Sequence, residues 1–254
     1  MKPQNENRTG KKLPFYRTLL PWKGDSRKLI VQKFVSLAAV CVFLGCALFL
    51  IWELVVLPAA ADAEQQDIKN IYYSSSETGS SPPASSAPER DPQGKLMTFL
   101  ELQKVNPSIV GWIKVPNTII DLPVLQATKK DPEYYLTHDY LNRYSGYGSI
   151  FADANCSVEK GKSRSIVLYG HSLNSGRMFT QLNRYKKLDF YKSAPVFSFD
   201  TVDSKSQWKI ISVFLTNILP EQGKPFNYLK TSFKNDSDFL NFVYQMRIRS
   251  IYNT

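Results

Sequence analysis

One stretch of the chain, from Phe34 to Trp52, runs for nineteen consecutive residues without a charge. At about 1.5 Å rise per residue, a helix of this length covers roughly 28 Å, close to the hydrocarbon thickness of a bilayer of about 30 Å. The apolar region of a signal peptide is shorter, about 7–15 residues. We predict an uncleaved transmembrane helix over residues 34–57. A signal peptide cleaved near residues 59–61, where three alanines stand together, is the alternative.

The charges on the two sides of this run are unequal. Residues 1–33 hold nine Lys or Arg against two acidic residues, whereas three carboxylates follow within residues 62–67. Basic residues favour the cytoplasmic side of a membrane. We expect a single-pass protein of the cell membrane with a cytoplasmic tail over residues 1–33 and an extracellular remainder. The net charge of +10 then reflects mostly a tail that contacts membrane lipid, and it predicts no nucleic-acid site.

Residues 58–94 are rich in Ser and Pro. Such a segment cannot bury enough apolar surface to offset the entropy lost on ordering it. We therefore predict a flexible stalk over these residues, and some helix is allowed at its start, around residues 62–72.

The globular part is predicted over residues 95–254. Strands are expected at residues 109–115, 118–124, 149–151, 165–169, 196–199 and 207–215. Helices are expected around residues 96–105, 132–136, 178–185 and 236–247, the last one capped by Asp236 or Ser237. Many short strands with a few helices between them predict a mainly β fold, with a β-barrel-like core and short peripheral helices.

His171 is the residue whose placement most suggests chemistry. It follows the apolar run 165–169 and a glycine, so a buried strand brings it to a strand end. Turn residues 173–176 come next, before an apolar helical pattern. A histidine on the rim of a rigid scaffold is placed to exchange protons, although a lone histidine beside a strand is as often structural.

Four segments, in this order along the chain, resemble those of class B sortases. They are residues 111–124 (GWIKVPNTIIDLPV), 134–139 (YYLTHD), 148–153 (GSIFAD) and 169–182 (YGHSLNSGRMFTQL). Together with the N-terminal anchor, the resemblance covers roughly residues 95–254. Four motifs in order make a specific match.

The resemblance implies a cysteine transpeptidase with a sortase-like β-barrel on the outer face of a Gram-positive-type membrane. In this family a cysteine thiolate attacks the Thr–X bond of a C-terminal sorting signal and forms a thioacyl enzyme. A histidine, here His171, supplies acid and base, and an arginine supports the oxyanion. The implied partners are a surface protein that bears a sorting signal and an amine of cell-wall peptide or pilin. No cofactor and no metal is implied.

The resemblance breaks near the end of the sequence. In the family the nucleophile ends a late strand with a Thr-Leu-x-Thr-Cys pattern, and the arginine starts the next strand. The printed sequence stops at Thr254 and contains no such pattern. We expect residues 95–254 to be an incomplete catalytic domain that lacks its last two strands and is inactive at this length. The alternative is a non-catalytic pseudosortase, or a truncated gene product, that at most binds sorting peptides.

Leu136, Tyr228 and Leu229 are candidates for substrate binding. Apolar and aromatic side chains beside the active-site strands suit an extended peptide, although ordinary core packing would explain them as well. Cys156 lies in a connecting loop and is expected to be incidental. His138 is expected to pack or to form a hydrogen bond, because no second His or carboxylate is spaced for a metal site with it.

Overall fold

The computed structural model describes residues 20–77, 90–216 and 226–254 of the chain. The chain divides into two compact units, Met1–Glu64 and Gln65–Thr254. Much of the predicted basic tail and the Ser/Pro-rich part of the predicted stalk lie outside the described residues. The boundaries predicted for tail, anchor and stalk stay predictions.

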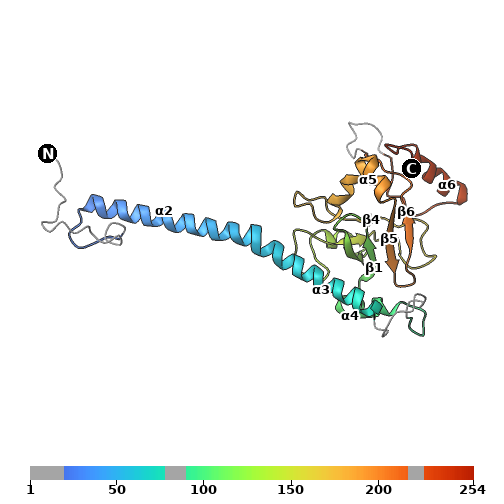
Figure 1. Ribbon diagram of the computed structural model, residues 1–254, viewed down its shortest axis with the longest axis horizontal. Coiled ribbons are helices and arrows are strands. Elements are labelled where there is room, and N and C mark those ends of the chain that lie inside the picture. Colours follow the sequence, from blue (N-terminus) through green and yellow to red (C-terminus); the bar gives the residue numbers. More distant parts are fainter. Residues whose placement is uncertain (1–19, 78–89, 217–225) are drawn as a thin grey trace. The chain divides into compact units, whose positions relative to one another are not determined.

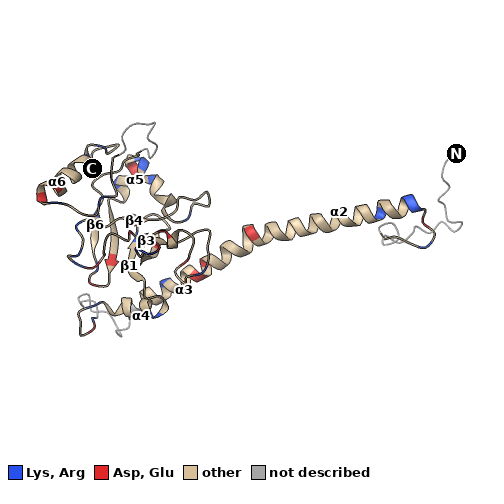
Figure 2. Cartoon of the chain, turned by 180° about the vertical axis from the view of Figure 1, so that it is seen from behind, with Lys and Arg blue, Asp and Glu red and all other residues tan. Residues whose placement is uncertain are grey.

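The first unit contains a long helix with an apolar, exposed surface. Helix α2 (Arg27–Ile51) begins after Ser26, whose hydroxyl oxygen accepts the N–H of Leu29. Its Lys and Arg residues lie in the first turns, and an uncharged stretch follows (Figure 2). Among the described residues, one helix is long and apolar enough to cross a membrane, and it contains this stretch. The prediction of one N-terminal apolar helix is confirmed.

A π-helical turn, η1 (Trp52–Val56), joins α2 to α3 (Leu57–Glu77). Pro58 has no N–H group, so the carbonyl one turn before it lacks its usual helical partner. The helix widens there, and the N–H of Leu57 bonds to the carbonyl of Trp52. Whereas the sequence allows helix around residues 62–72, the structure has helix throughout Leu57–Glu77.

Within the second unit, the end of α3 packs on the sheet. Ile68 and Tyr72, one helical turn apart, are both buried. The ring of Tyr72 stacks on that of Trp112 with 4.2 Å between centroids, and its hydroxyl donates to Asp200 over 2.6 Å. This part of the predicted stalk is therefore tied to the domain, because two large side chains share one helix face.

Six strands form one curled sheet in the order β4-β3-β2-β1-β5-β6, of which β4, β1, β5 and β6 are labelled in Figure 1. Their bounds are β1 (Ile109–Lys114), β2 (Asp121–Gln126), β3 (Ile150–Ala152), β4 (Leu168–Tyr169), β5 (Val196–Thr201) and β6 (Gln207–Lys209). Neighbouring strands are antiparallel, except that β2 and β3 are parallel. The predicted mainly β, barrel-like fold is confirmed as a half-barrel with β4 and β6 at its edges.

Side chains on a strand alternate between the two faces of the sheet. Each face packs against its own hydrophobic cluster. On β1, Trp112 packs in the cluster that contains residues of α3 and of α4 (Met97–Val105). Its neighbour Ile113 packs in the other cluster, with residues of the 3₁₀ helix η3 (Phe179–Lys186) and of α5 (Leu188–Ser193). The remaining helices of the described residues are the 3₁₀ helix η2 (Tyr134–Leu136) and α6 (Asp236–Arg247).

Two local expectations are corrected. The cap of α6 is Asn235, whose side-chain oxygen accepts the N–H of Asp238 over 2.9 Å, and neither Asp236 nor Ser237 takes this role. The strand expected over residues 207–215 ends at Lys209. Its pairing with β5 stops because the N–H of Ile210 bonds to the carbonyl of Pro195, which has no N–H to return a bond.

Candidate active site around His171

His171 lies two residues after Tyr169, the last residue of edge strand β4, and Gly170 stands between them. A Cβ on Gly170 would lie 2.7 Å from the ring of Phe179, so only glycine lets η3 come this close. The imidazole is partly buried, and its Nε2 lies 2.7 Å from the carbonyl oxygen of Leu136. A carbonyl only accepts, so Nε2 carries the proton and Nδ1 of the neutral ring is the acceptor. His171 can therefore take up a proton on Nδ1 and release it again.

Leu136, one of the predicted substrate-binding residues, thus contacts His171 through its backbone carbonyl. It is the last residue of η2, and Gly148 lies beneath it with a φ of 57°. A Cβ on Gly148 would lie 2.6 Å from the Leu136 oxygen, so this glycine keeps the carbonyl accessible to the imidazole. The structure thus indicates a second role for Leu136, which is to orient the imidazole of His171. Its role in substrate binding stays a prediction.

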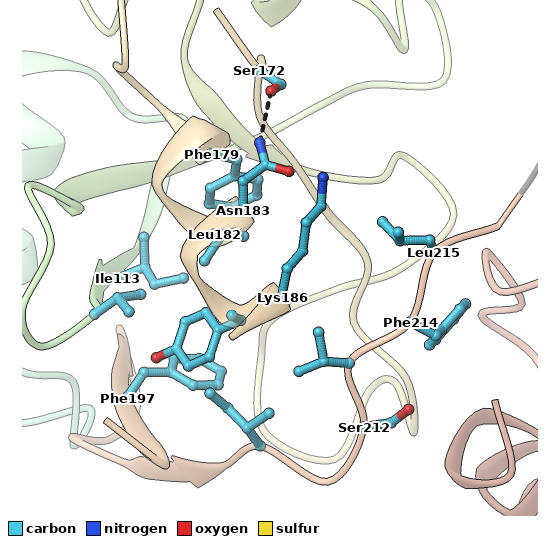
Figure 3. Close-up of a pocket in the computed structure, with 14 residues that line it drawn as sticks. Ile113, Ser172, Phe179, Leu182, Asn183, Lys186, Phe197, Ser212, Phe214 and Leu215 are labelled. Atoms are coloured by element: carbon cyan, nitrogen blue, oxygen red, sulfur yellow. Dashed lines mark hydrogen bonds between the residues drawn. The ribbon is translucent and has the colours of Figure 1, made fainter. Parts of the chain in front are cut away.

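The turn that follows His171 is fixed by side chains of η3. Thr180 accepts the N–H of Leu173 over 2.5 Å and donates to the carbonyl of the same residue over 3.0 Å. Asn183 donates to the hydroxyl of Ser172 over 3.3 Å (Figure 3). Polar residues on a short helix gave no sequence signal for this role, because their partners are fixed only by tertiary contact.

A second interaction missed from the sequence lies at the end of β4. The Tyr169 hydroxyl donates to the carboxylate of Asp153 over 2.7 Å. Burial, and then this hydrogen bond, raise the pKa of the Tyr169 phenol, and the nearby phenol of Tyr228 adds to the shift. Burial also acts to raise the pKa of Asp153, but hydrogen bonds from Asn155 and Tyr169 outweigh it and leave that pKa below its usual value.

A mostly apolar cavity of about 480 Å³ begins beside Ser172, the residue after His171. Figure 3 shows the η3 side chains Phe179, Leu182 and Lys186 on one side and Phe214 and Leu215 on another. The full lining is Ile113, Val115, Ser172, Phe179, Leu182, Asn183, Tyr185, Lys186, Phe197, Ile210, Ser212, Val213, Phe214 and Leu215. The size and lining suit an apolar peptide segment.

The other two predicted substrate-binding residues, Tyr228 and Leu229, do not line this cavity. Tyr228 meets Phe214, which lines it, edge to face with 6.3 Å between ring centroids. Leu229 is exposed and is not among the lining residues. Their roles in substrate binding stay predictions.

Neither Cys156 nor His138 joins the site. The Cys156 thiol is buried and donates to the carbonyl of Asp153 over 3.4 Å, and burial raises its pKa, opposite to what a thiolate nucleophile needs. His138 stacks on Tyr134, and its Nδ1 lies 2.8 Å from the Tyr134 carbonyl. Among the described residues, no group of three His, Cys, Asp or Glu could hold a metal ion.

Comparison with known proteins gives relatives of this chain. No protein-family model matches the sequence. Sortase B of Listeria monocytogenes serovar 1/2a is 32% identical over 154 residues, 61% of this chain and 59% of that protein. Sortase B of Staphylococcus aureus is 33% identical over 156 residues, 61% of this chain and 60% of that protein. The chain therefore spans about three fifths of the length of these curated relatives.

Solved structures agree. A Staphylococcus aureus sortase B–substrate complex matches with a TM-score of 0.64 and 27% identity, over 78% of this chain and 82% of that one. Sortase B from Listeria monocytogenes matches with a TM-score of 0.54 and 33% identity, over 61% of this chain and 84% of that one. The chain belongs to the class B sortase family.

Proposed function

We propose that this domain is built for sortase-type transpeptidation, with His171 as the residue that exchanges protons with the substrate. The observation that carries the proposal is the placement of His171 after β4, where it is held through Nε2 and is followed by Ser172, which lines an apolar cavity. Family membership supports it. One matched sortase B structure is a substrate complex and another is complexed with triglycine, which fits a peptide substrate and an amine acceptor.

In this reaction a thiolate attacks the carbonyl carbon of the sorting-signal Thr–X bond and forms a tetrahedral oxyanion. The imidazolium of His171 gives its Nδ1 proton to the departing amine, so the C–N bond breaks and a thioester remains. The acceptor amine then attacks the thioester and loses a proton to Nδ1, and the thiolate leaves. His171 ends in its starting state, and Leu136 holds the same ring nitrogen throughout.

We further propose that residues 1–254 alone bind sorting peptides without cleaving them. The chain has three cysteines: Cys41 and Cys46 belong to α2, and Cys156 is buried and does not line the cavity that begins at Ser172. Within the second unit, Cys156 is therefore not positioned as the nucleophile. A peptide-binding pseudosortase is therefore the second candidate function, favoured by an apolar cavity whose lining contains no cysteine.

The test uses the detergent-solubilised full chain, a sorting peptide with a fluorophore and quencher on either side of the Thr–X bond, and triglycine as acceptor. Anisotropy of a labelled peptide reports binding, and dequenching reports cleavage. Saturable binding without dequenching supports the proposal. Cleavage that is lost in Cys156→Ala would show that Cys156 is the nucleophile and contradict our placement of it.

Sequencing the gene past the codon for Thr254 separates the two functions. If the reading frame encodes a Thr-Cys strand and an Arg strand, the longer product should be a working transpeptidase. His171→Ala should then lower kcat/KM by about 10²–10⁴-fold, the usual contribution of general acid–base catalysis. His138→Ala is the matched control and should keep most activity. Equal losses in both variants would refute a catalytic role for His171.

We also propose that the N-terminal helix is an uncleaved single-pass anchor, with the basic tail in the cytoplasm and the sortase-like domain outside the cell. The basic residues at the start of α2 and the uncharged stretch after them support this orientation (Figure 2).

A further inference from the structure

A second cavity, of about 310 Å³, lies among α4, β1, β2, the segment 154–159 and Val202. This segment follows β3, and the N–H of Asp153 bonds to the carbonyl of Val167, the residue before β4. Because β3 and β4 are antiparallel, the cavity lies toward the start of β4, whereas His171 follows its end. Neither β4 nor β6, the two edges of the sheet, contributes a lining residue. The cavity is therefore separate from the site around His171.

Two amide side chains of the lining have a fixed orientation. Gln126 donates from Nε2 to the carbonyl of Asp153, and Gln103 donates from Nε2 to that of Ile109, each over 3.0 Å. A carbonyl only accepts, so these bonds identify the nitrogen of each amide and leave its oxygen as an acceptor. Within the described part of the chain, no group donates to either oxygen. A ligand with N–H groups fits these acceptors.

The lining also contains one cation and one carboxylate, Lys95 and Glu159. Both are exposed, and neither forms an ion pair with a described residue. Their backbones are fixed, because the N–H of Lys95 donates to the Asp91 carboxylate over 2.7 Å and that of Glu159 donates to the Ser157 hydroxyl over 3.2 Å. Such pre-organisation lowers the cost of binding. A zwitterion matches both charges, whereas a ligand with one charge matches only one of them.

Much of the remaining lining is aliphatic, including Val110, Val158 and Val202. The volume lies at the lower end of the range for ligand pockets, about 300–1,000 Å³, so the ligand is small. We propose that this cavity binds a small zwitterion of about dipeptide size. Glu159 and the glutamine oxygens hold its ammonium group, Lys95 holds its carboxylate, and the valines contact its aliphatic part. The proposal does not rest on transpeptidation.

The probe is the dipeptide Ala-Val, added to the detergent-solubilised full chain and followed by isothermal titration calorimetry. N-acetyl-Ala-Val lacks the ammonium group, and Ala-Val amide lacks the carboxylate. We expect saturable binding of Ala-Val and about three- to tenfold weaker binding of each blocked peptide, the usual effect of one hydrogen bond.

Cys156 shows whether the peptide occupies this cavity, because its buried thiol belongs to the lining. Bound Ala-Val should slow the reaction of Cys156 with iodoacetamide further, and the blocked peptides at the same concentration should protect it less. Peptide mass spectrometry measures the modification. Binding at the cavity that begins at Ser172 would leave the rate unchanged, since Cys156 does not line that cavity.

Variants test each charge against the peptide that lacks its partner. Glu159→Gln should weaken the binding of Ala-Val by about three- to tenfold and leave that of N-acetyl-Ala-Val unchanged. Lys95→Gln should do the same for Ala-Val and leave Ala-Val amide unchanged. Lys160→Gln is the matched control, because Lys160 is adjacent to Glu159 but outside the lining, and it should bind normally. Circular dichroism establishes that each variant is folded.

Four results would overturn the proposal. They are the absence of saturable binding at millimolar Ala-Val, equal affinity for the blocked peptides, binding that leaves the Cys156 rate unchanged, and equal loss of both peptides in Glu159→Gln. The last would mean that Glu159 supports the cavity without meeting an ammonium group. No step requires His171 or cleavage, so failure here leaves the proposed transpeptidase function standing, and failure of that function leaves this site standing.

Discussion

The chain contains two histidines, and each is held through a different ring nitrogen. His171 bonds through Nε2 to the carbonyl of Leu136, and His138 bonds through Nδ1 to the carbonyl of Tyr134. Both acceptors are backbone groups of η2, so the position of this short helix fixes both imidazoles. The sequence marks His171 by its place after a strand, but it contains no signal for which nitrogen is engaged.

Opposite tautomers are expected for the two neutral imidazoles. In long-range ¹⁵N–¹H correlation spectra above the titration range of both rings, His171 should carry its proton on Nε2 and His138 on Nδ1, because a carbonyl requires a donor. The variant His138→Gln assigns the signals. A neutral His171 protonated on Nδ1 would mean that the Leu136 hydrogen bond is not formed in solution.

Cys156 should react slowly in the folded chain. Burial raises the pKa of its thiol, so less thiolate is present at a given pH than for a free cysteine. Near pH 8, iodoacetamide should modify Cys156 several-fold more slowly in the native than in the denatured chain, and the native rate should still be rising above the usual thiol pKa. Peptide mass spectrometry separates Cys156 from Cys41 and Cys46. Rapid native modification would contradict its burial.

Among the elements, α3 shows how tertiary contact overrides composition. Its residues are polar enough to predict a flexible stalk, but Tyr72 meets Trp112 and the buried carboxylate of Asp200. Burial, and then this hydrogen bond, raise the pKa of the Tyr72 phenol well above its usual range, so the hydroxyl stays protonated and donates.

Removing that hydroxyl should destabilise the domain. Tyr72→Phe loses a buried hydrogen bond to a carboxylate and should lower the free energy of unfolding by about 1–3 kcal/mol. The adjacent Tyr73, whose hydroxyl bonds Asp121 at the surface, is the matched control, and Tyr73→Phe should cost less than about 1 kcal/mol. Urea unfolding of the solubilised full chain, followed by near-UV circular dichroism, measures both. Equal costs would show that α3 does not dock through Tyr72.

At the scale of the whole molecule, the anchor can be tested in membranes. The chain should stay in the pellet after alkaline carbonate extraction, because its uncharged run is long enough to span the bilayer. Trypsin added outside intact spheroplasts should digest the region after residue 58 and spare the basic residues before 33. A mature N-terminus near Ala61, found by N-terminal sequencing, would instead establish a cleaved signal peptide.

The features that the sequence by itself determined are those set by neighbours along the chain. The uncharged run predicts the long helix, strand β1 follows from its apolar pattern, and α6 spans the predicted residues 236–247. The position of His171 after a strand likewise follows from local pattern, because a strand and the turn after it are read from a few adjacent residues.

Only the tertiary structure decided the contacts between distant segments. Leu136 and His171, Tyr72 and Asp200, and Pro195 and Ile210 meet because the sheet brings them together. The same applies to the short β6, whose last residue Lys209 pairs with Val196 just after Pro195, and to the cavity beside it. Periodicity within one segment contains no information on which other segment lies across from it, so these features required the fold.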